Sequence, residues 1–243
     1  MSILGNIIFD MDGTLIDSMD HHAIAFSKIL KKRYSVPEAF ARREYYMTAG
    51  SALDDQFQHA LSSYYEKQVA DICDLVKDFW NRVSRIPPKL MTSVSHTVPR
   101  LAEAGYNLFL TSGCRPDVVQ YRMSHANLDR YFLLMLGADQ SDIELKKGDP
   151  HFKLFRKHLK LSEYRFRVNT MMVGDGVHDM QLGTRAGFFT VGLESSVGKK
   201  QLLDAGADLV ISKVGELLEI LSNVIEDNRQ FKPISSLWED LKT

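Results

Sequence analysis

Residues 7–18 read Ile7-Ile8-Phe9-Asp10-Met11-Asp12-Gly13-Thr14-Leu15-Ile16-Asp17-Ser18. The apolar run at 7–9 is bounded by turn residues, which predicts a short buried strand. Asp10 and Asp12 then leave the carboxyl end of that strand, where open α/β sheets place their ligand sites. The alternative is an ordinary strand and turn, in which the aspartates serve only the turn geometry. Later segments of the chain favour the chemical interpretation.

Strand and helix patterns alternate from residue 94 to residue 225, which predicts an α/β fold with a Rossmann-like parallel sheet and helices on both faces. We expect strands at 107–110, 132–136, 170–173, 188–191 and 209–211, and helices at 94–104, 116–126, 150–159, 199–205 and 214–225. From 18 to 90 the apolar residues recur at helical spacing instead. The expected organisation is therefore a core of residues 1–17 and 91–243 with an inserted helical cap at 18–90.

Composition limits the classes of partner. The 243 residues carry a formal net charge of −1, so no basic field attracts nucleic acid or an anionic membrane surface. The two cysteines, Cys73 and Cys114, have no metal-ligand spacing, and a reducing cytoplasm is the expected location. No apolar stretch is long enough to span a bilayer. Apolar residues in the polar tail 227–243 are expected to dock on the core, and the sequence does not indicate an oligomeric state.

Thr111-Ser112-Gly113 ends the second predicted strand. Hydroxyl groups and backbone N–H groups at a strand end before a helix can donate hydrogen bonds to phosphate oxygens. The same tripeptide is also an ordinary loop sequence, so its position carries the inference. We therefore expect these three residues to bind phosphate.

A second acidic motif, Val173-Gly174-Asp175-Gly176-Val177-His178-Asp179, follows the strand predicted at 170–173. Carboxylate oxygens are hard ligands of the kind that Mg²⁺ prefers. Two acidic motifs at strand ends, together with a phosphate-binding loop, predict a magnesium site that acts on a phosphorylated molecule.

Jointly these motifs resemble the haloacid dehalogenase superfamily, in particular its phosphatase branch with a small helical (C1-type) cap, which includes phosphoglycolate phosphatases and β-phosphoglucomutases. The resemblance runs from Ile7 to about Leu221. It implies that Asp10 is the nucleophile and that Asp12 is the general acid and base. It also implies Mg²⁺ bound by the Asp10 and Asp175 carboxylates and the Asp12 carbonyl, with Asp179 holding a metal-bound water or the lysine.

The lysine motif of the superfamily lies before a helix, and here the chain departs from the common Lys-Pro-x-Pro pattern. It reads Lys146-Lys147-Gly148-Asp149-Pro150. Pro150 suits the first helical turn with Asp149 as the N-cap, and alignment on Pro150 selects Lys147 as the catalytic lysine. Lys146 remains an alternative.

The cap supplies two further candidates for substrate binding. His22 matches a histidine found in relatives five residues after the aspartate at position 17, although a surface or capping histidine is a competing interpretation. Gly50 lies in a turn that matches the loop such caps lower onto the substrate, and it also suits an ordinary helix-to-helix turn.

The expected activity is Mg²⁺-dependent hydrolysis of a small phosphorylated metabolite, of the phosphoglycolate or sugar phosphate class, through an aspartyl phosphate. A phosphomutase of the β-phosphoglucomutase type is an alternative, but no arginine lies at 50–53, where that enzyme's cap binds a second phosphate. A catalytically silent domain that binds phosphate or a partner is another alternative. The presence of Asp10, Asp12, Lys147 and Asp175 argues against it.

Overall fold

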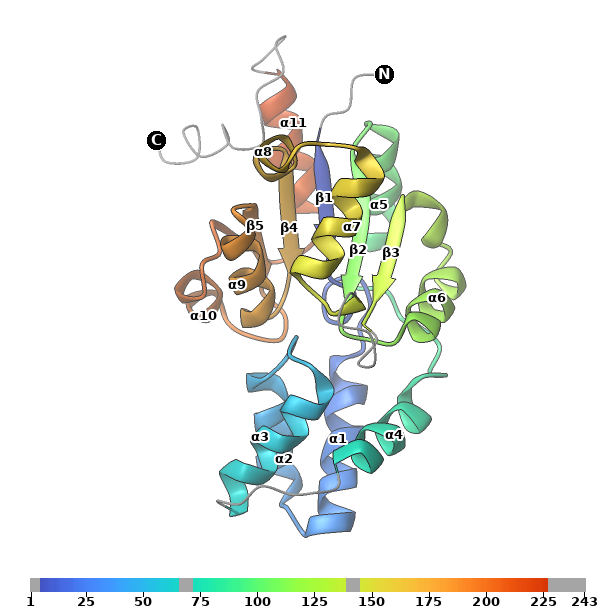
Figure 1. Ribbon diagram of the computed structural model, residues 1–243, viewed down its shortest axis with the longest axis vertical. Coiled ribbons are helices and arrows are strands. Elements are labelled where there is room, and N and C mark those ends of the chain that lie inside the picture. The colour runs from blue at the N-terminus through green and yellow to red at the C-terminus, as the bar shows by residue number, and fades with distance from the viewer. Residues whose placement is uncertain (1–4, 66–71, 139–144, 227–243) are drawn as a thin grey trace.

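The computed structural model describes residues 5–65, 72–138 and 145–226. In this part of the chain six parallel strands form one sheet in the order β3-β2-β1-β4-β5-β6 (Figure 1). The strands are β1 (Asn6–Phe9), β2 (Asn107–Ser112), β3 (Leu134–Gly137), β4 (Thr170–Gly174), β5 (Phe189–Leu193) and β6 (Leu209–Ile211). The predicted parallel α/β sheet is confirmed, with strand ends that differ from the prediction by two residues or fewer.

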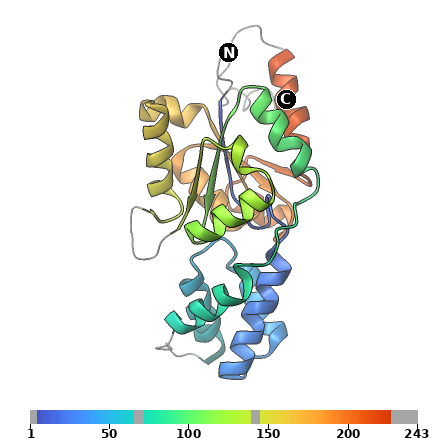
Figure 2. The same ribbon diagram turned by 90° about the vertical axis from the view of Figure 1, so that its right-hand side faces the viewer.

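Helices cover both faces of the sheet (Figure 2). Ile8, Phe109 and Met172 belong to the apolar cluster on one face, whose helices are α7 (Asp149–Leu159), α8 (Glu163–Val168) and α9 (Val177–Ala186). Ile7 and Leu108 precede Ile8 and Phe109 in their strands, and their side chains point to the opposite face of the sheet. They belong to the apolar cluster on that face, whose helices include α5 (Val94–Glu103), α6 (Pro116–His125) and α11 (Glu216–Glu226). Since both faces are buried, the central strands are apolar almost throughout. The helix α10 (Lys199–Asp204) packs against α9.

Four more helices lie beyond the carboxyl ends of the strands (Figure 1). They are α1 (Met19–Tyr34), α2 (Glu38–Met47), α3 (Leu53–Tyr65) and α4 (Ile72–Val83). Stacked and edge-on aromatic rings join them, and the rings of Phe26 and Phe57 stack with centroids 4.3 Å apart. We refer to residues 18–90 as the cap, and its division from the core at these residues stays a prediction.

Several local predictions differ from the structure. Asp149 is the first residue of α7 and Gly148, with a φ of +108°, precedes it, so Asp149 is not the N-cap. The short helix α8 is an addition to the predicted elements. The tail at 227–243 lies outside the described residues. Among the described helices, none is both long enough and apolar enough to cross a membrane.

Candidate active site

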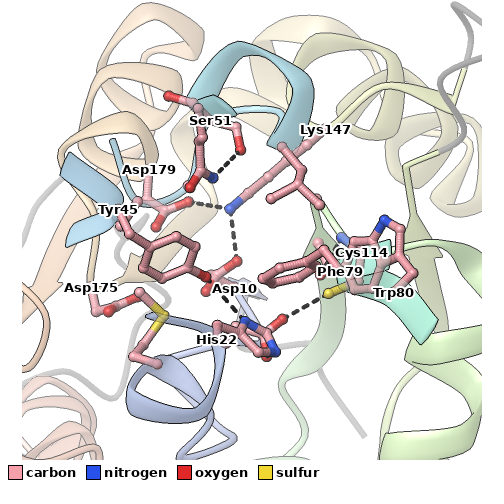
Figure 3. Close-up of a pocket in the computed structure, with 18 residues that line it drawn as sticks. Asp10, His22, Tyr45, Ser51, Phe79, Trp80, Cys114, Lys147, Asp175 and Asp179 are labelled. Atoms are coloured by element: carbon pink, nitrogen blue, oxygen red, sulfur yellow. Dashed lines mark hydrogen bonds and ion pairs between the residues drawn. The ribbon is translucent and has the colours of Figure 1, made fainter. Parts of the chain in front are cut away.

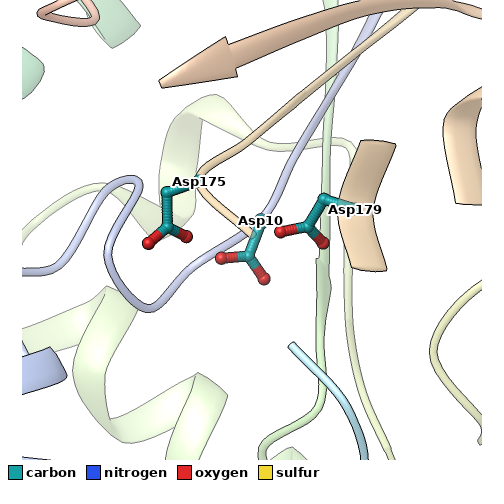
Figure 4. A group of neighbouring side chains, drawn as sticks. All are labelled: Asp10, Asp175 and Asp179. Atoms are coloured by element: carbon teal, nitrogen blue, oxygen red, sulfur yellow. The ribbon is translucent and has the colours of Figure 1, made fainter. Parts of the chain in front are cut away.

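Three carboxylates lie close together at the carboxyl ends of β1 and β4. The strand order of the sheet changes direction between these two strands. Asp10 follows β1 and Asp175 follows β4, and these two strands are neighbours in register, with Phe9 beside Val173. Asp179 lies in the first turn of α9. Each of the three residues offers one carboxylate oxygen, and these oxygens lie within 4.8 Å of one another (Figure 4). The arrangement is a candidate site for a divalent cation at the edge where doubly wound sheets bind their ligands.

Burial and mutual repulsion govern the charge of this cluster. The exposed fraction of Asp10, Asp175 and Asp179 is 4% or less. Burial is the main cause that raises the pKa of Asp10, and the carboxylates of Asp179 and Asp175 raise it further. Burial and the Asp179 carboxylate also raise the pKa of Asp175, to about 7. Such a cluster requires cations to keep all three carboxylates ionised.

Lys147 supplies one of these cations. Its Nζ lies 2.7 Å from Asp10 Oδ1 and 2.6 Å from Asp179 Oδ1 (Figure 3). Although burial opposes its charge, these two carboxylates raise the pKa of Lys147, so the ammonium form is retained. Lys146 is exposed. The structure therefore brings Lys147, and not Lys146, to the nucleophile candidate.

The turn after β1 is shaped around Asp175. Gly13 has a φ of +85°, and a Cβ built on it would lie 2.1 Å from Asp175 Oδ2. A side chain at position 13 would thus displace the carboxylate as well as strain the backbone. Thr14 Oγ1 contacts Asp10 Oδ2 at 3.4 Å and Asp175 Oδ1 at 3.3 Å. The Asp12-Gly13-Thr14 segment therefore positions the carboxylates of Asp10 and Asp175 in addition to forming the turn.

Asp12 has its own set of donors. Oδ1 accepts hydrogen bonds from Ser18 Oγ and Arg122 Nη1, and Cys114 Sγ donates to Oδ2 at 2.9 Å. Burial alone would raise the pKa of Asp12, but the Arg122 guanidinium above all, assisted by His22, lowers it to about 2. Asp12 is therefore held as a carboxylate next to the pocket.

Arg122 was not predicted to contribute to the site. It lies on α6 among the buried residues Val118, Val119 and Met123, and its own exposed fraction is 2%. Its Nη2 also lies 2.9 Å from His22 Nε2 and 3.2 Å from the Val83 carbonyl oxygen, both in the cap. The one available signal was a charged residue interrupting an apolar helix face, a pattern usually explained by a solvated side chain.

His22 lines the pocket and is deeply buried, and its role in substrate binding stays a prediction. Its Nδ1 lies 3.1 Å from the hydroxyl oxygen of Tyr45, and its exposed fraction is 3%. Burial lowers the pKa of His22 to about 4, an effect to which Arg122 adds. It is therefore a neutral partner of Arg122 at neutral pH.

The lowered pKa of His22 predicts a loss of stability on acidification. The folded pKa of about 4 lies below the ordinary value of 6.5, so the unfolded chain binds the proton more readily. This contribution is complete above pH 6.5 and is lost as the pH falls toward 4, by about 3 kcal/mol in total. In urea unfolding experiments between pH 6.5 and pH 4, the free energy of unfolding of His22→Gln should fall less than that of the unmodified protein. An identical pH dependence in the variant would contradict the assignment.

The phosphate-binding prediction for residues 111–113 requires a correction at Thr111. Ser112 and Gly113 line the pocket, whereas Thr111 does not. Its Oγ1 lies 2.7 Å from His151 Nδ1 on the other side of β2. Consecutive strand residues point to opposite faces, so only one of the two hydroxyls can reach the pocket. That hydroxyl belongs to Ser112.

Residues of the cap and of the core together line a cavity of about 60 Å³ around these groups. From the cap, five residues of the α2–α3 turn and α3 line it, namely Ala49, Gly50, Ser51, Leu53 and Gln56. Gly50 has a φ of +88°, and a Cβ there would lie 3.2 Å from His178 Cβ, so the turn lies close against the core. The structure places Gly50 at the pocket, and its role in substrate binding stays a prediction.

Comparison with known proteins shows relatives over nearly the whole chain. The family model of haloacid dehalogenase-like hydrolases matches residues 7–193. Pyrophosphatase PpaX of Bacillus mycoides is 27% identical over 222 residues, which cover 91% of this chain and 98% of the relative. Pyrophosphatase PpaX of Anoxybacillus flavithermus is 27% identical over 219 residues, covering 90% and 97%.

Solved structures share the fold at lower identity. A predicted phosphoglycolate phosphatase from Haemophilus somnus superposes with a TM-score of 0.73 at 22% identity, covering 90% of this chain and 99% of the other. A hydrolase from Pseudomonas syringae gives a TM-score of 0.73 at 20% identity, covering 90% and 98%. With the family model spanning most of the chain and both acidic motifs, this protein belongs to the haloacid dehalogenase-like hydrolases.

Proposed function

We propose that this enzyme is a Mg²⁺-dependent phosphatase that hydrolyses a small phosphorylated metabolite through an aspartyl phosphate on Asp10. The observation that carries the proposal is the pocket in which Lys147 lies 2.7 Å from Asp10 Oδ1 beside Asp175 and Asp179. The names of the PpaX pyrophosphatases and of the phosphoglycolate phosphatase neighbour support phosphoryl transfer as the chemistry. We also retain a cytoplasmic location as a prediction.

The donor set fits Mg²⁺. Three buried carboxylates face one ammonium group, so a divalent cation would balance the remaining charge. The Asp10 and Asp175 carboxylates and the Asp12 carbonyl would hold the ion, and Asp179 would hold a bound water or Lys147. When bound, Mg²⁺ supplies charge neutralisation for the phosphoryl oxygens.

The chain's own residues account for the two steps. In the first step, Asp10 attacks phosphorus in line, a bond from its carboxylate oxygen to phosphorus forms, and the ester oxygen leaves with a proton from Asp12. In the second, Asp12 removes a proton from a water that attacks the same phosphorus and frees Asp10. Lys147, the Ser112 hydroxyl and nearby backbone N–H groups would stabilise the charge on the phosphoryl oxygens throughout.

The pocket favours hydrolysis over a mutase reaction. A mutase must also hold a second phosphate on the sugar, which needs further cations. Among the described residues that line the pocket, Lys147 is the only lysine or arginine. We therefore keep the phosphatase as the proposed activity.

The metal proposal predicts a thermal shift that is independent of turnover. Mg²⁺ at a hundredfold excess over its Kd should stabilise the folded protein by about 2.7 kcal/mol and raise Tm by about 5–10 °C. Asp175→Asn should lose most of this shift, because it removes a ligand from the cluster. Asp204→Asn, which changes an exposed carboxylate paired with Lys200, is the matched control and should keep it. Equal shifts in both variants would contradict the assigned site.

The activity itself is tested by phosphate release from a panel that includes pyrophosphate, phosphoglycolate, sugar phosphates and nucleotides, with Mg²⁺ and with EDTA. Release that requires Mg²⁺ and favours one class supports the proposal and identifies the substrate class. Folded, Mg²⁺-bound protein that releases no phosphate from any of these compounds would overturn it.

A further inference from the structure

One residue that lines the pocket has a buried side-chain atom without a partner within the described part of the protein. Gln56 lies on α3, lines the cavity and has an exposed fraction of 5%. Its Nε2 donates to the Ser51 carbonyl oxygen at 2.9 Å, a bond that Figure 3 marks beside Ser51. Its Oε1 is buried and accepts no hydrogen bond from any described residue.

The bond to Ser51 decides which end of the amide is unpaired. A backbone carbonyl oxygen only accepts hydrogen bonds, so the NH₂ end of Gln56 must face it. The opposite orientation would place two acceptors together. The unpaired group is therefore an acceptor whose orientation is already fixed.

A fixed, buried acceptor on a residue that lines the reaction pocket has a chemical implication. Buried polar side-chain atoms are nearly always paired, and an unpaired one weakens the folded state unless a ligand supplies its partner. The phosphoryl end of a substrate would lie by Asp10 and Lys147, which leaves the alcohol end for the cap residues. Gln56 Oε1 therefore matches an O–H group of the alcohol.

Resting on the phosphatase function proposed above, we propose that Gln56 is a specificity-determining residue that accepts a hydrogen bond from a hydroxyl of the leaving group. The substrates are then phosphate monoesters of hydroxylated alcohols, such as polyol or sugar phosphates. Phosphoglycolate presents only acceptor oxygens to Gln56 at neutral pH and fits the pocket less well. The same holds for the fully ionised form of pyrophosphate.

Matched substrates test this inference in the unmodified enzyme. Propyl phosphate, the two propanediol phosphates and glycerol 1-phosphate share a three-carbon chain and differ only in their hydroxyl groups. We expect kcat/KM to rise by about tenfold or more when the hydroxyl that reaches Gln56 is present, because a site built for a hydroxyl discriminates against its absence. Equal kcat/KM values across the series would overturn the inference.

A variant separates this role from a structural one. Gln56→Met keeps the length of the side chain but removes the acceptor, so the ratio of kcat/KM for the hydroxylated substrates to kcat/KM for propyl phosphate should fall to about one. Gln58→Met, on the same helix, changes a residue that bonds to Ser62 instead, and should keep the preference. An equal loss on all four substrates in Gln56→Met would mean a structural role and overturn the inference.

The failure of the underlying function has a different signature. Without Mg²⁺-dependent hydrolysis of any ester in the series, or with hydrolysis that survives Asp10→Asn, the phosphatase proposal itself fails and the role of Gln56 fails with it. Hydrolysis that depends on Asp10 but ignores the hydroxyl groups overturns the Gln56 inference alone.

Discussion

Replacing Asp10 with asparagine is expected to lower kcat by about 10⁴-fold or more and to leave the fold intact. The amide has nearly the same shape but is a very weak nucleophile, and removal of a nucleophile from a covalent mechanism costs rates of this order. The buried cluster loses one negative charge, so the metal-free protein should melt within a few degrees of the unmodified one. Phosphate release and thermal melting of Asp10→Asn check both statements.

Asp117→Asn provides the matched control for this variant. Asp117 is an exposed aspartate on α6 that pairs with Arg115 and does not line the pocket. Its replacement should leave phosphate release unchanged. Residual release by Asp10→Asn within tenfold of the unmodified rate would contradict the nucleophile assignment.

Asp12→Asn should affect the two chemical steps in different ways. Alkyl phosphates need a proton on the leaving oxygen, so their hydrolysis should fall by about 10²–10⁴-fold. Aryl phosphates have good leaving groups, so phosphorylation of Asp10 should continue. The second step still lacks its base, which predicts a burst of phenol equal to the enzyme concentration followed by slow turnover.

The low pKa of Asp12 describes the enzyme without a substrate. Pairing with Arg122 favours the carboxylate, with a pKa of about 2. An incoming phosphate dianion acts in the opposite direction, since a nearby like charge raises the pKa of a carboxyl group. Rapid-quench kinetics of Asp12→Asn with an aryl phosphate and an alkyl phosphate measure the role. Equal losses on both substrates with no burst would contradict the acid–base assignment.

The sequence predicts the sheet and the acidic strand ends because both follow local rules. An apolar run that ends in Asp10 or in Gly174-Asp175 marks a buried strand and its carboxyl end. The parallel topology then places the two ends side by side. Lys147 was selected from alignment on Pro150, although Asp149 is not the cap that this alignment assumed.

Side-chain direction is harder to derive where a strand is buried on both faces. Thr111 and Ser112 are both polar and both buried, so the sequence pattern does not distinguish the face toward the pocket from the face toward α7. Only the packing of His151 against Thr111 decides the question.

Arg122 and Gln56 escaped prediction for a related reason. Each is a polar residue on a mostly apolar helix face, where the local pattern alone does not indicate a role in the site. Arg122 bonds to Asp12 across 110 positions of the chain. Local periodicity does not show a contact between residues so far apart in the sequence.

The central claim is that Asp10 carries the phosphoryl group during turnover. Its most direct test is mass spectrometry of Asp12→Asn after brief incubation with Mg²⁺ and an aryl phosphate, followed by acid quench and peptide mapping. We expect one phosphoryl group per chain, on the peptide that contains Asp10, and none when EDTA is present. A phenol burst without phosphorylated protein, or a phosphoryl group on another residue, would contradict it.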